Sequence, residues 1–517
     1  MAQGARTRRI PQTDAVTPTV GFHPTIDPGP GGVKDFLGKR VHLIGIGGCG
    51  MRGAALILMR RGATVSGSDA APSSEIARLV KAGARIAIGQ RKENLPDDLD
   101  LVVYSAAIKP ENPELLEARR RACETIKYSD LLGRLMRGRE GIAVAGTHGK
   151  STTTALTAYA LRRAGRDPSF VVGAMVEQLG GGSGVGDGPH FVVEACEYDR
   201  SFLHLSPKYA TILNIEEDHL DCYRDLEDII QAFRLFANLL PPDGVLIANG
   251  ESRAAMAAAE AAAARVETFG FNRGMTWQAV DLNADHGCYR FGIARDGEVV
   301  ARTRLQIPGR HHVGNALAAA ALCWHGGVPM DAVARILPEF RGAQRRLTLR
   351  GEANGVTILD DYAHHPTEIQ VTLQAARDMY QPRRLWVVFQ PHQHSRTRFL
   401  LTDFARSFAV ADVVVVPEIY FVRDSESERS RVTARDLVDR IRRNGGEARY
   451  EASFDAIVDQ LVSAVQPGDV VLTMGAGDVW RVADDLVARL KGSEPVGEFV
   501  FAPPGTVVTL GDLRDAG

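Results

Sequence analysis

Short apolar runs recur along the chain, each followed by glycine or polar residues and then by a segment of helical periodicity. Such runs are typical of strands buried on both faces of a parallel sheet. They form three successive blocks, which predict an α/β protein of three domains with mostly parallel sheets covered by helices. The expected strands are residues 40–45, 63–65 and 100–104, then 142–145, 191–194 and 209–215, then 356–359, 385–389, 412–416 and 469–473.

The regions outside this alternation set the domain boundaries. Residues 1–36 are rich in proline and lack the apolar core of a signal peptide, so they are expected to form a flexible arm. The domains are expected to be 37–140, 141–338 and 339–491, with 492–517 as a tail. Residues 180–188 and 421–431 are predicted to be surface loops, and 254–264 a surface helix.

The most informative segment joins the apolar strand at 142–145 to a helix expected over 151–164. A triphosphate requires backbone N–H groups directed at it, a helix N-terminus behind it and a nearby cation. Gly146 and Gly149 permit close approach, Lys150 supplies charge, and the Ser151 hydroxyl can bind Mg²⁺. The loop is shorter than the usual eight-residue form, which would have glycine at position 144. The predicted ATP-binding loop comprises Gly146, Thr147, His148, Gly149, Lys150, Ser151 and Thr152.

A second glycine-rich turn follows the first predicted strand. Its spacing, with Asp69 nineteen residues beyond the last glycine, matches the dinucleotide-binding fingerprint. The pattern fits any diphosphate ligand, because the glycines let phosphates rest on a helix N-terminus. Two phosphate-binding turns in successive blocks suggest a diphosphate substrate in the first and ATP in the second. The turn contains Gly45, Gly47, Gly48 and Gly50.

Carboxylates follow the strands next to the phosphate loop. Glu194 ends one expected strand, and the cluster 216–219, which ends in His219, follows the next. Ligands of open α/β sheets lie at this edge, and Mg²⁺ prefers oxygen ligands. A carboxylate here could therefore bind a metal together with Ser151.

The third block has two polar loops, 360–366 and 390–398, that each follow an apolar strand. Both are dense in hydrogen-bonding and cationic groups. With Arg345 and Arg346, they could hold a carboxylate acceptor and contact the nucleotide. A solvated loop is the alternative for each.

Composition narrows the possible partners. The chain has 517 residues, a net charge of −2, 45% hydrophobic and 24% charged residues. This balance gives no electrostatic case for binding nucleic acid or an anionic membrane. No apolar stretch approaches the length of a membrane span, and the six cysteines are scattered, so we expect a cytoplasmic protein with free thiols.

Taken in order, these motifs resemble those of the Mur ligase family of peptidoglycan synthesis, over roughly residues 40–490. The resemblance implies a Rossmann-like UDP-binding domain, a central P-loop ATPase-like domain and a C-terminal Rossmann-like domain. It implies an ATP- and Mg²⁺-dependent ligase that joins L-alanine to UDP-N-acetylmuramate through an acyl phosphate. The motifs are 45–51, 105–108, 145–150, Glu194, 214–221, 308–311 with Asn315, 360–368, 389–392 and 395–398.

The resemblance also implies roles for individual residues. Lys150 and Ser151 would hold the β- and γ-phosphates and Mg²⁺, with Glu194 on the first metal and His219 on a second. His311 and Asn315 would lie near adenine. The ribose and phosphates would be contacted by Arg346 with Asp360 or Asp361, the amino acid by Tyr362, His365 and Arg396, and the UDP moiety by the first glycine turn with Ser68, Asp69 and Ser105.

Three positions depart from the family pattern. Cys196 stands where the family has aspartate, His312 follows His311 where asparagine is usual, and Gln393 replaces an arginine. Arginine binds carboxylate bidentately and glutamine cannot, which weakens the case for L-alanine as the acceptor. Residues 225–240 contain no lysine, so the carbamylated lysine of other family members is not expected.

Three other readings remain open at this point. The nearest is a sister ligase that attaches another amino acid or a recycled peptide. The second is a non-catalytic UDP-sugar sensor, which the retention of Lys150 and Glu194 disfavours. The third is a nicotinamide-dependent oxidoreductase, which leaves the phosphate loop unexplained. Oligomeric state is not indicated by the sequence.

Overall fold

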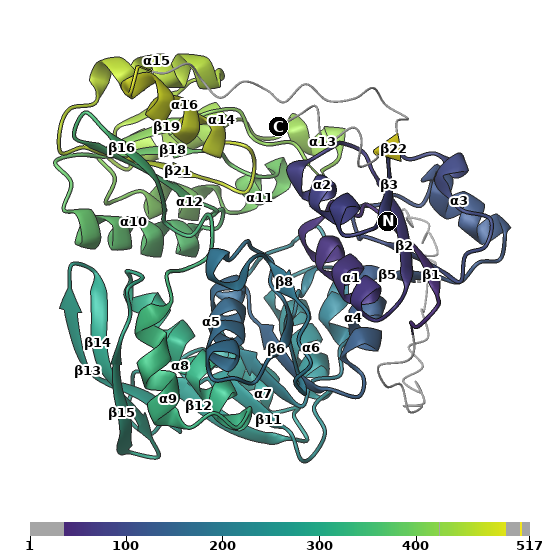
Figure 1. The fold of residues 1–517 in the computed structure, drawn as a ribbon. Helices are drawn as coiled ribbons and strands as arrows, with labels where there is room; N and C mark the ends of the chain where they lie inside the picture. The colour runs from purple at the N-terminus through teal and green to yellow at the C-terminus, as the bar shows by residue number, and fades with distance from the viewer. Residues whose placement is uncertain (1–35, 423, 493–506, 509–517) are drawn as a thin grey trace, which may run out of the picture.

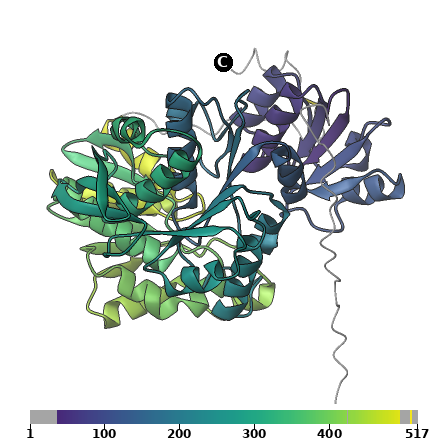
Figure 2. The same ribbon diagram turned by 90° about the horizontal axis from the view of Figure 1, so that it is seen from below.

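A computed structural model of the chain describes residues 36–422, 424–492 and 507–508. It contains three sheets with helices packed on them, which confirms the predicted three-domain α/β fold (Figure 1). The predicted arm 1–36 and tail 492–517 lie almost entirely outside the described residues. The central domain lies between the other two, as the view from below also shows (Figure 2).

The first sheet has the strand order β22-β3-β2-β1-β4-β5 and is parallel except for β22. The glycine turn at 45–48 joins the central strand β1 to α1, so it lies at the carboxyl edge. The elements are β1 (Arg40–Ile44), α1 (Cys49–Arg60), β2 (Thr64–Asp69), α2 (Ser74–Lys81), β3 (Arg85–Ile88), β4 (Leu101–Tyr104), α3 (Pro113–Arg120), β5 (Thr125–Lys127), α4 (Tyr128–Met136) and β22 (Val507–Val508).

The central sheet has ten strands in the order β15-β14-β13-β12-β11-β10-β6-β9-β7-β8. Strand β6 (Glu140–Ala145) leads through the phosphate loop into α5 (Lys150–Arg163) and lies parallel to β9 (His190–Glu194) and β10 (Tyr209–Ile212). The others are β7 (Ser169–Val171), β8 (Ser183–Gly184), α6 (Leu226–Ala237), β11 (Val245–Asn249), α7 (Arg253–Ala259), β12 (Arg265–Gly270), β13 (Trp277–Asp285), β14 (Cys288–Arg295), β15 (Glu298–Arg304), α8 (Arg310–His325) and α9 (Met330–Ile336).

Helix α5 is buried from Ser151 to Leu161, and it packs against α8, which is buried over most of its length. Small alanine and threonine side chains let these two helices approach closely. A helix that is buried nearly all round has no polar face, which explains why α5 lacks clear amphipathic periodicity. The close packing fixes the phosphate loop at the start of α5 relative to α8.

The third sheet has the order β16-β17-β21-β18-β19-β20, with β16 antiparallel to β17 and the remaining pairs parallel. Its elements are β16 (Thr348–Ala353), β17 (Val356–Asp361), α10 (Pro366–Tyr380), β18 (Leu385–Phe389), α11 (His394–Phe399), α12 (Leu401–Ser407), β19 (Val413–Val416), α13 (Glu426–Arg429), α14 (Ala434–Arg443), β20 (Ala448–Tyr450), α15 (Phe454–Ala464), β21 (Val470–Met474) and α16 (Trp480–Leu490).

Several local expectations were wrong. The antiparallel strands β13–β15 were not anticipated, and the predicted loops 180–188 and 421–431 contain β8 and α13. The predicted helix 254–264 ends at Ala259, and residues of the predicted tail form β22. The strands β8 and β22 are two residues long, too short to show any period in the sequence.

The first and central domains share an apolar core, and their backbones also approach each other closely. In α4, a Cβ added to Gly133 would lie 2.0 Å from the carbonyl oxygen of His204 in the central domain. Backbone cannot retract as a flexible side chain can. Glycine is therefore required at position 133 because the two domains approach closely there. The backbone conformation of a turn is not the reason.

We expect Gly133→Ala to lower the free energy of unfolding by about 1–3 kcal/mol, because the methyl group forces α4 off its neighbour. Gly314→Ala in α8 is the matched control, since the nearest atoms to its added Cβ lie 3.9 Å away. That variant should gain about 0.5–1 kcal/mol from the lower entropy of the unfolded chain. Urea unfolding of both variants checks this, and equal effects would contradict the proposed packing.

Candidate active site

A cavity of ≈ 640 Å³ lies where the three domains meet. Cys49 and Arg52 line it from the first domain, and Tyr362 and Arg396 from the third. The central domain contributes the phosphate loop and the ends of β9 and β10. Parallel strands in all three domains therefore direct their carboxyl ends toward one space, as expected for ligand sites in α/β sheets. Its lining from the central domain includes Thr147, Gly149, Lys150, Ser151, Glu194, Glu197 and His219.

The phosphate loop has the backbone that its glycines suggested. Gly146 and Gly149 have φ of 146° and 83°, values that disfavour other residues, and Gly149 precedes the first residue of α5. A Cβ at Gly149 would lie 2.6 Å from the side-chain oxygen of Asn315. The free N–H groups of the first turn of α5 point out of its N-terminus, which suits an anion.

Lys150 reaches back over the loop. Its Nζ donates to the carbonyl oxygens of Gly146 and Thr147 at 2.6 and 3.0 Å and lies 2.9 Å from the Glu197 carboxylate. Burial acts to lower the pKa of Lys150, but the carboxylate of Glu197 outweighs it and raises the pKa above its ordinary value. Lys150 is therefore a fixed cation at the mouth of the phosphate loop.

Glu197 was not singled out from the sequence. Its side chain is only 4% exposed, and one carboxylate oxygen lies 3.6 Å from Nε2 of His219. A single glutamate in the loop after β9 carries no periodic signal, so only the three-dimensional contact with Lys150 reveals its role.

Ser151, Glu194 and His219 all line the larger cavity. Glu194 accepts a hydrogen bond from the Gly173 amide at 2.7 Å, which orients its carboxylate. His219 has a φ of 53°, and its buried Nδ1 has no hydrogen-bond partner among the described residues. A hydroxyl, a carboxylate and an imidazole around one cavity form a donor set that fits a divalent cation.

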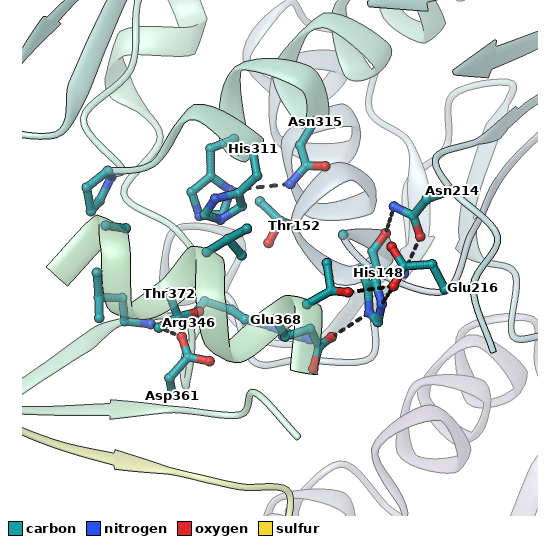
Figure 3. A pocket seen from close by; sticks show the side chains of 17 residues that line it. His148, Thr152, Asn214, Glu216, His311, Asn315, Arg346, Asp361, Glu368 and Thr372 are labelled. Atoms are coloured by element: carbon teal, nitrogen blue, oxygen red, sulfur yellow. Dashed lines mark hydrogen bonds and ion pairs between the residues drawn. The ribbon is translucent and has the colours of Figure 1, made fainter. Parts of the chain in front are cut away.

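A second cavity of ≈ 140 Å³ lies between α8 and α10, next to the phosphate loop (Figure 3). His311 and Asn315 line it from α8, and Arg346 and Asp361 from the third domain. Burial lowers the pKa of His311 to about 4, so its imidazole is neutral at physiological pH. His148, Gly149 and Thr152 of the phosphate loop also line this cavity.

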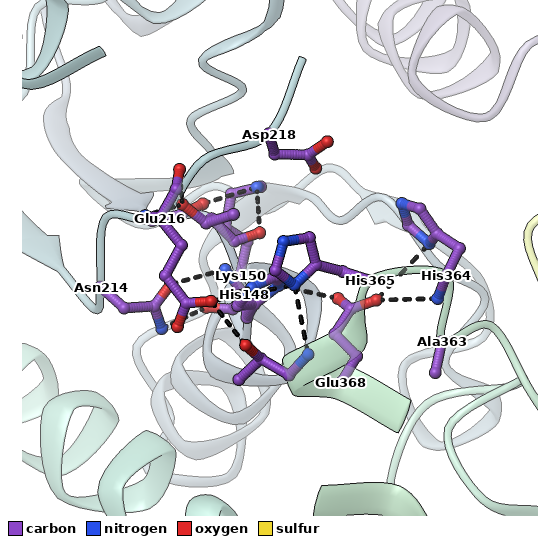
Figure 4. A network of polar contacts seen from close by, with 12 residues as sticks. His148, Lys150, Asn214, Glu216, Asp218, Ala363, His364, His365 and Glu368 are labelled. Atoms are coloured by element: carbon purple, nitrogen blue, oxygen red, sulfur yellow. Dashed lines mark hydrogen bonds and ion pairs between the residues drawn. The ribbon is translucent and has the colours of Figure 1, made fainter. Parts of the chain in front are cut away.

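A seam of polar contacts joins the phosphate loop to the start of α10 (Figure 4). His148 lies 3.3 Å from Glu216 and 3.1 Å from Glu368, and the Thr367 hydroxyl donates to Glu216 at 2.6 Å. Burial acts to lower the pKa of His148, yet hydrogen bonds to the two carboxylates raise it to about 9. His148 is consequently cationic and links the central and third domains.

A buried ion pair closes the same interface. Both Nε and Nη2 of Arg396 donate to one oxygen of Asp218, at 2.9 and 2.8 Å. Burial acts to raise the pKa of Asp218, but the Arg396 guanidinium outweighs it and holds that pKa well below its usual range. Arg396 lines the larger cavity and also binds the central domain.

Most backbone N–H groups of the first glycine turn already donate hydrogen bonds within the protein. Gly45 donates to the carbonyl oxygen of Ser68, Gly48 donates to that of Gly45, and Gly47 donates to the Asp69 carboxylate at 2.8 Å. Ser105 lies beside this turn: a Cβ atom built on Gly45 would be 3.2 Å from the Ser105 hydroxyl oxygen. The α1 N-terminus, which includes Gly50, is therefore the part of the turn that has N–H groups for a ligand.

Four of the predicted site residues are bound by partners within the protein. Asp360 is fully buried and binds Arg345 and Thr473, so it does not line either cavity. Ser68 is also fully buried, and its hydroxyl donates to Glu114 at 2.6 Å. The Asp69 carboxylate accepts a hydrogen bond from the Gly47 amide. His365 contacts Glu217, and its neighbour His364 lines the larger cavity. Buried strand-end residues cannot be told from exposed ones by sequence position alone.

Comparison with known proteins identifies the class of this site. Residues 40–140 match the Mur ligase family catalytic domain, 144–323 the Mur ligase middle domain and 345–477 the Mur ligase glutamate ligase domain. The chain belongs to the Mur ligase family, which confirms the resemblance seen in its motifs.

Relatives and solved structures agree with this assignment. The chain is 42% identical to a UDP-N-acetylmuramate–L-alanine ligase of Caldanaerobacter subterraneus, over 88% of this chain and 98% of the relative. It is similar to the crystal structure of a UDP-N-acetylmuramate–alanine ligase from Thermotoga maritima, with a TM-score of 0.73, 29% identity and coverage of 88% and 99%. A murein peptide ligase from Psychrobacter arcticus gives a TM-score of 0.68 at 26% identity, with coverage of 88% and 99%.

We expect Arg396→Ala to open the interface between the central and third domains, because it leaves the Asp218 carboxylate buried and unpaired, at a cost of about 3–5 kcal/mol. Arg398→Ala is the matched control: its partner Glu428 lies in the same domain. Small-angle scattering should show a larger radius of gyration for Arg396→Ala only. An unchanged radius for that variant would show that the ion pair does not hold the domains together.

Proposed function

We propose that this chain joins L-alanine to UDP-N-acetylmuramate, with conversion of ATP to ADP and phosphate, through an acyl-phosphate intermediate. The observation that carries this proposal is the cavity of ≈ 640 Å³, which brings Lys150, the strand-end carboxylates and Arg396 together from different domains. A ligation of three substrates requires such a shared space. The family membership and the named relatives at 38–42% identity support the same reaction.

ATP is proposed to bind across the two cavities. The triphosphate would lie against the phosphate loop, with Lys150 and the α5 N-terminus on its charges, and adenine would enter the smaller cavity near His311 and Asn315. Arg346 and Asp361 line that cavity from the third domain and are proposed to contact the ribose and phosphates. Closure of the third domain thus depends on the nucleotide.

Ser151, Glu194 and His219 are the residues proposed to hold Mg²⁺. When bound, the cation supplies charge neutralisation for the phosphoryl oxygens. The UDP moiety is proposed to bind at the first glycine turn, and Tyr362, His364 and Arg396 are proposed to face the amino acid. The domain boundaries 37–140, 141–338 and 339–491 and a cytoplasmic location belong to the same proposal.

Electrostatics dominate the proposed chemistry. The substrate carboxylate attacks the γ-phosphate of ATP, and ADP leaves. The neutral amine of the amino acid then attacks the carbonyl carbon of the acyl phosphate, and phosphate leaves as the amide forms. Two like charges 4 Å apart at an effective permittivity of 20 repel by about 4 kcal/mol. Lys150 is already held in its cationic form beside the phosphate loop, so its charge offsets this repulsion. A closed cavity also keeps water from the acyl phosphate.

We expect phosphate release by the purified protein only when UDP-N-acetylmuramate, L-alanine and Mg-ATP are all present. Lys150→Ala should lower kcat by about 10²–10³-fold, because a preorganised charge is lost. Lys208→Ala is the control, since this lysine pairs with Glu140 at the start of β6 and lines neither cavity. A coupled phosphate assay measures each rate, and circular dichroism checks the fold.

The acceptor is tested in the same assay. L-alanine should give the highest kcat/KM in a panel with glycine, L-serine and a peptide that begins with L-alanine. Preference for the peptide would replace the proposal by a peptide ligase. Phosphate release that ignores both co-substrates would refute ligation altogether.

A further inference from the structure

Three potential metal ligands converge where the phosphate loop meets α10. They are His148 of the loop, Glu216 after β10 and His365 directly before α10 (Figure 4). One ligand atom from each lies within 4.8 Å of the other two. Side-chain exposures are 12% for His148, 36% for Glu216 and 6% for His365, so the cluster is enclosed but reachable.

Each imidazole has its outer nitrogen fixed by a second partner. Nδ1 of His148 lies 3.1 Å from the Glu368 carboxylate, and Nε2 of His365 lies 3.1 Å from the carbonyl oxygen of Glu217. Metal-bound histidines usually donate their other N–H to a carboxylate or a backbone carbonyl, which orients the ring. The inner nitrogens, Nε2 of His148 and Nδ1 of His365, are thereby directed at Glu216. His148 carries a proton on Nε2 when no metal is bound, and a cation that binds there displaces this proton.

The spacing also suits a small four-coordinate cation. The carboxylate oxygen Oε2 of Glu216 lies 3.3 Å from Nε2 of His148 and 3.8 Å from Nδ1 of His365. Tetrahedral zinc, with bonds of about 2.0–2.1 Å, places its ligands about 3.4 Å apart. These two distances differ from that spacing by about half an ångström or less. The third distance, between the two imidazole nitrogens, is within 4.8 Å.

We propose that His148, Glu216 and His365 form a binding site for Zn²⁺ or a similar borderline transition-metal cation. Water supplies the fourth ligand from the smaller cavity, which His148 and Glu216 also line. The site is separate from the Mg²⁺ position proposed above, because none of its three residues lines the larger cavity with Ser151 and Glu194.

An ion at this site would cross-link two domains. His148 and Glu216 belong to the central domain, and His365 belongs to the third. The bound state is therefore the closed arrangement, and the ion holds the phosphate loop against α10. Metal binding would replace two hydrogen bonds. They are donated by the Thr367 hydroxyl to Glu216 at 2.6 Å and by the Thr367 amide to Nδ1 of His365 at 3.3 Å.

The test is a titration of the full-length, chelator-treated protein with Co²⁺, whose visible absorption is strong in four-coordinate sites. Excess Mg²⁺ is present and substrates are absent, so the result does not depend on the proposed ligase activity. We expect one Co²⁺ per chain with this absorption, displaced by Zn²⁺. His365→Ala and Glu216→Gln should each weaken binding at least about tenfold, and Glu368→Gln, which removes a positioning carboxylate, about tenfold.

Two controls and a second measurement decide the outcome. His286→Ala, on the exposed β13–β14 turn, and His219→Ala should both bind Co²⁺ as the unmodified protein does. A loss confined to His219→Ala, or unchanged binding in His365→Ala, would overturn the proposal. Because His365→Ala could fail to fold, Zn²⁺-soaked crystals of the unmodified protein provide a check. An anomalous peak among His148, Glu216 and His365 is expected, and a peak elsewhere only would also overturn the site.

Discussion

The structure of this site depends on keeping a buried lysine charged. Lys150 starts α5, where the helix dipole disfavours a cation, and it is enclosed by the loop that it serves. Its charge is tolerated because Glu197 and two loop carbonyls surround its Nζ. An incoming triphosphate would compete with these partners for the same ammonium group. The loop is therefore preorganised for an anion, and Glu197 serves as the counter-ion when phosphate is absent.

The contact between the third and central domains also depends on buried carboxylates being paired with cationic side chains. Glu216 and Asp218 follow β10 in the central domain, and cationic groups from both sides neutralise them. These contacts are polar and line the two cavities, so they hold the domains less permanently than an apolar interface would. Such an interface permits opening for exchange of substrates while retaining one defined closed geometry.

Much of the fold could be predicted from the sequence. Strand β18 is apolar at every position and β21 at every position except Thr473, and each precedes a polar loop, so the three sheets were correctly anticipated. The phosphate loop was predictable because its glycines are dictated by backbone geometry. In contrast, β13–β15 alternate exposed and buried positions irregularly, and their pairing depends on the neighbouring central strands.

Individual site residues were harder to predict. Asp360 and Asp361 are adjacent at the end of β17, yet Asp361 lines the smaller cavity and Asp360 binds Arg345. Successive strand residues point to opposite faces, and the sequence does not say which face meets the cavity. The same ambiguity affects His364 and His365, which direct their rings to different neighbours.

The short strand β22 has a consequence for the first domain. It pairs antiparallel with β3, through Val507 with Ala87 and Val508 with Ile86. Without it, β3 would be the outermost strand of that sheet, with a row of unpaired N–H and C=O groups. The C-terminal segment thus shields an edge that could otherwise recruit a strand from another chain. The residues that cover this edge lie about four hundred positions further along the chain than β3, and they are outside the three segments that the family models match.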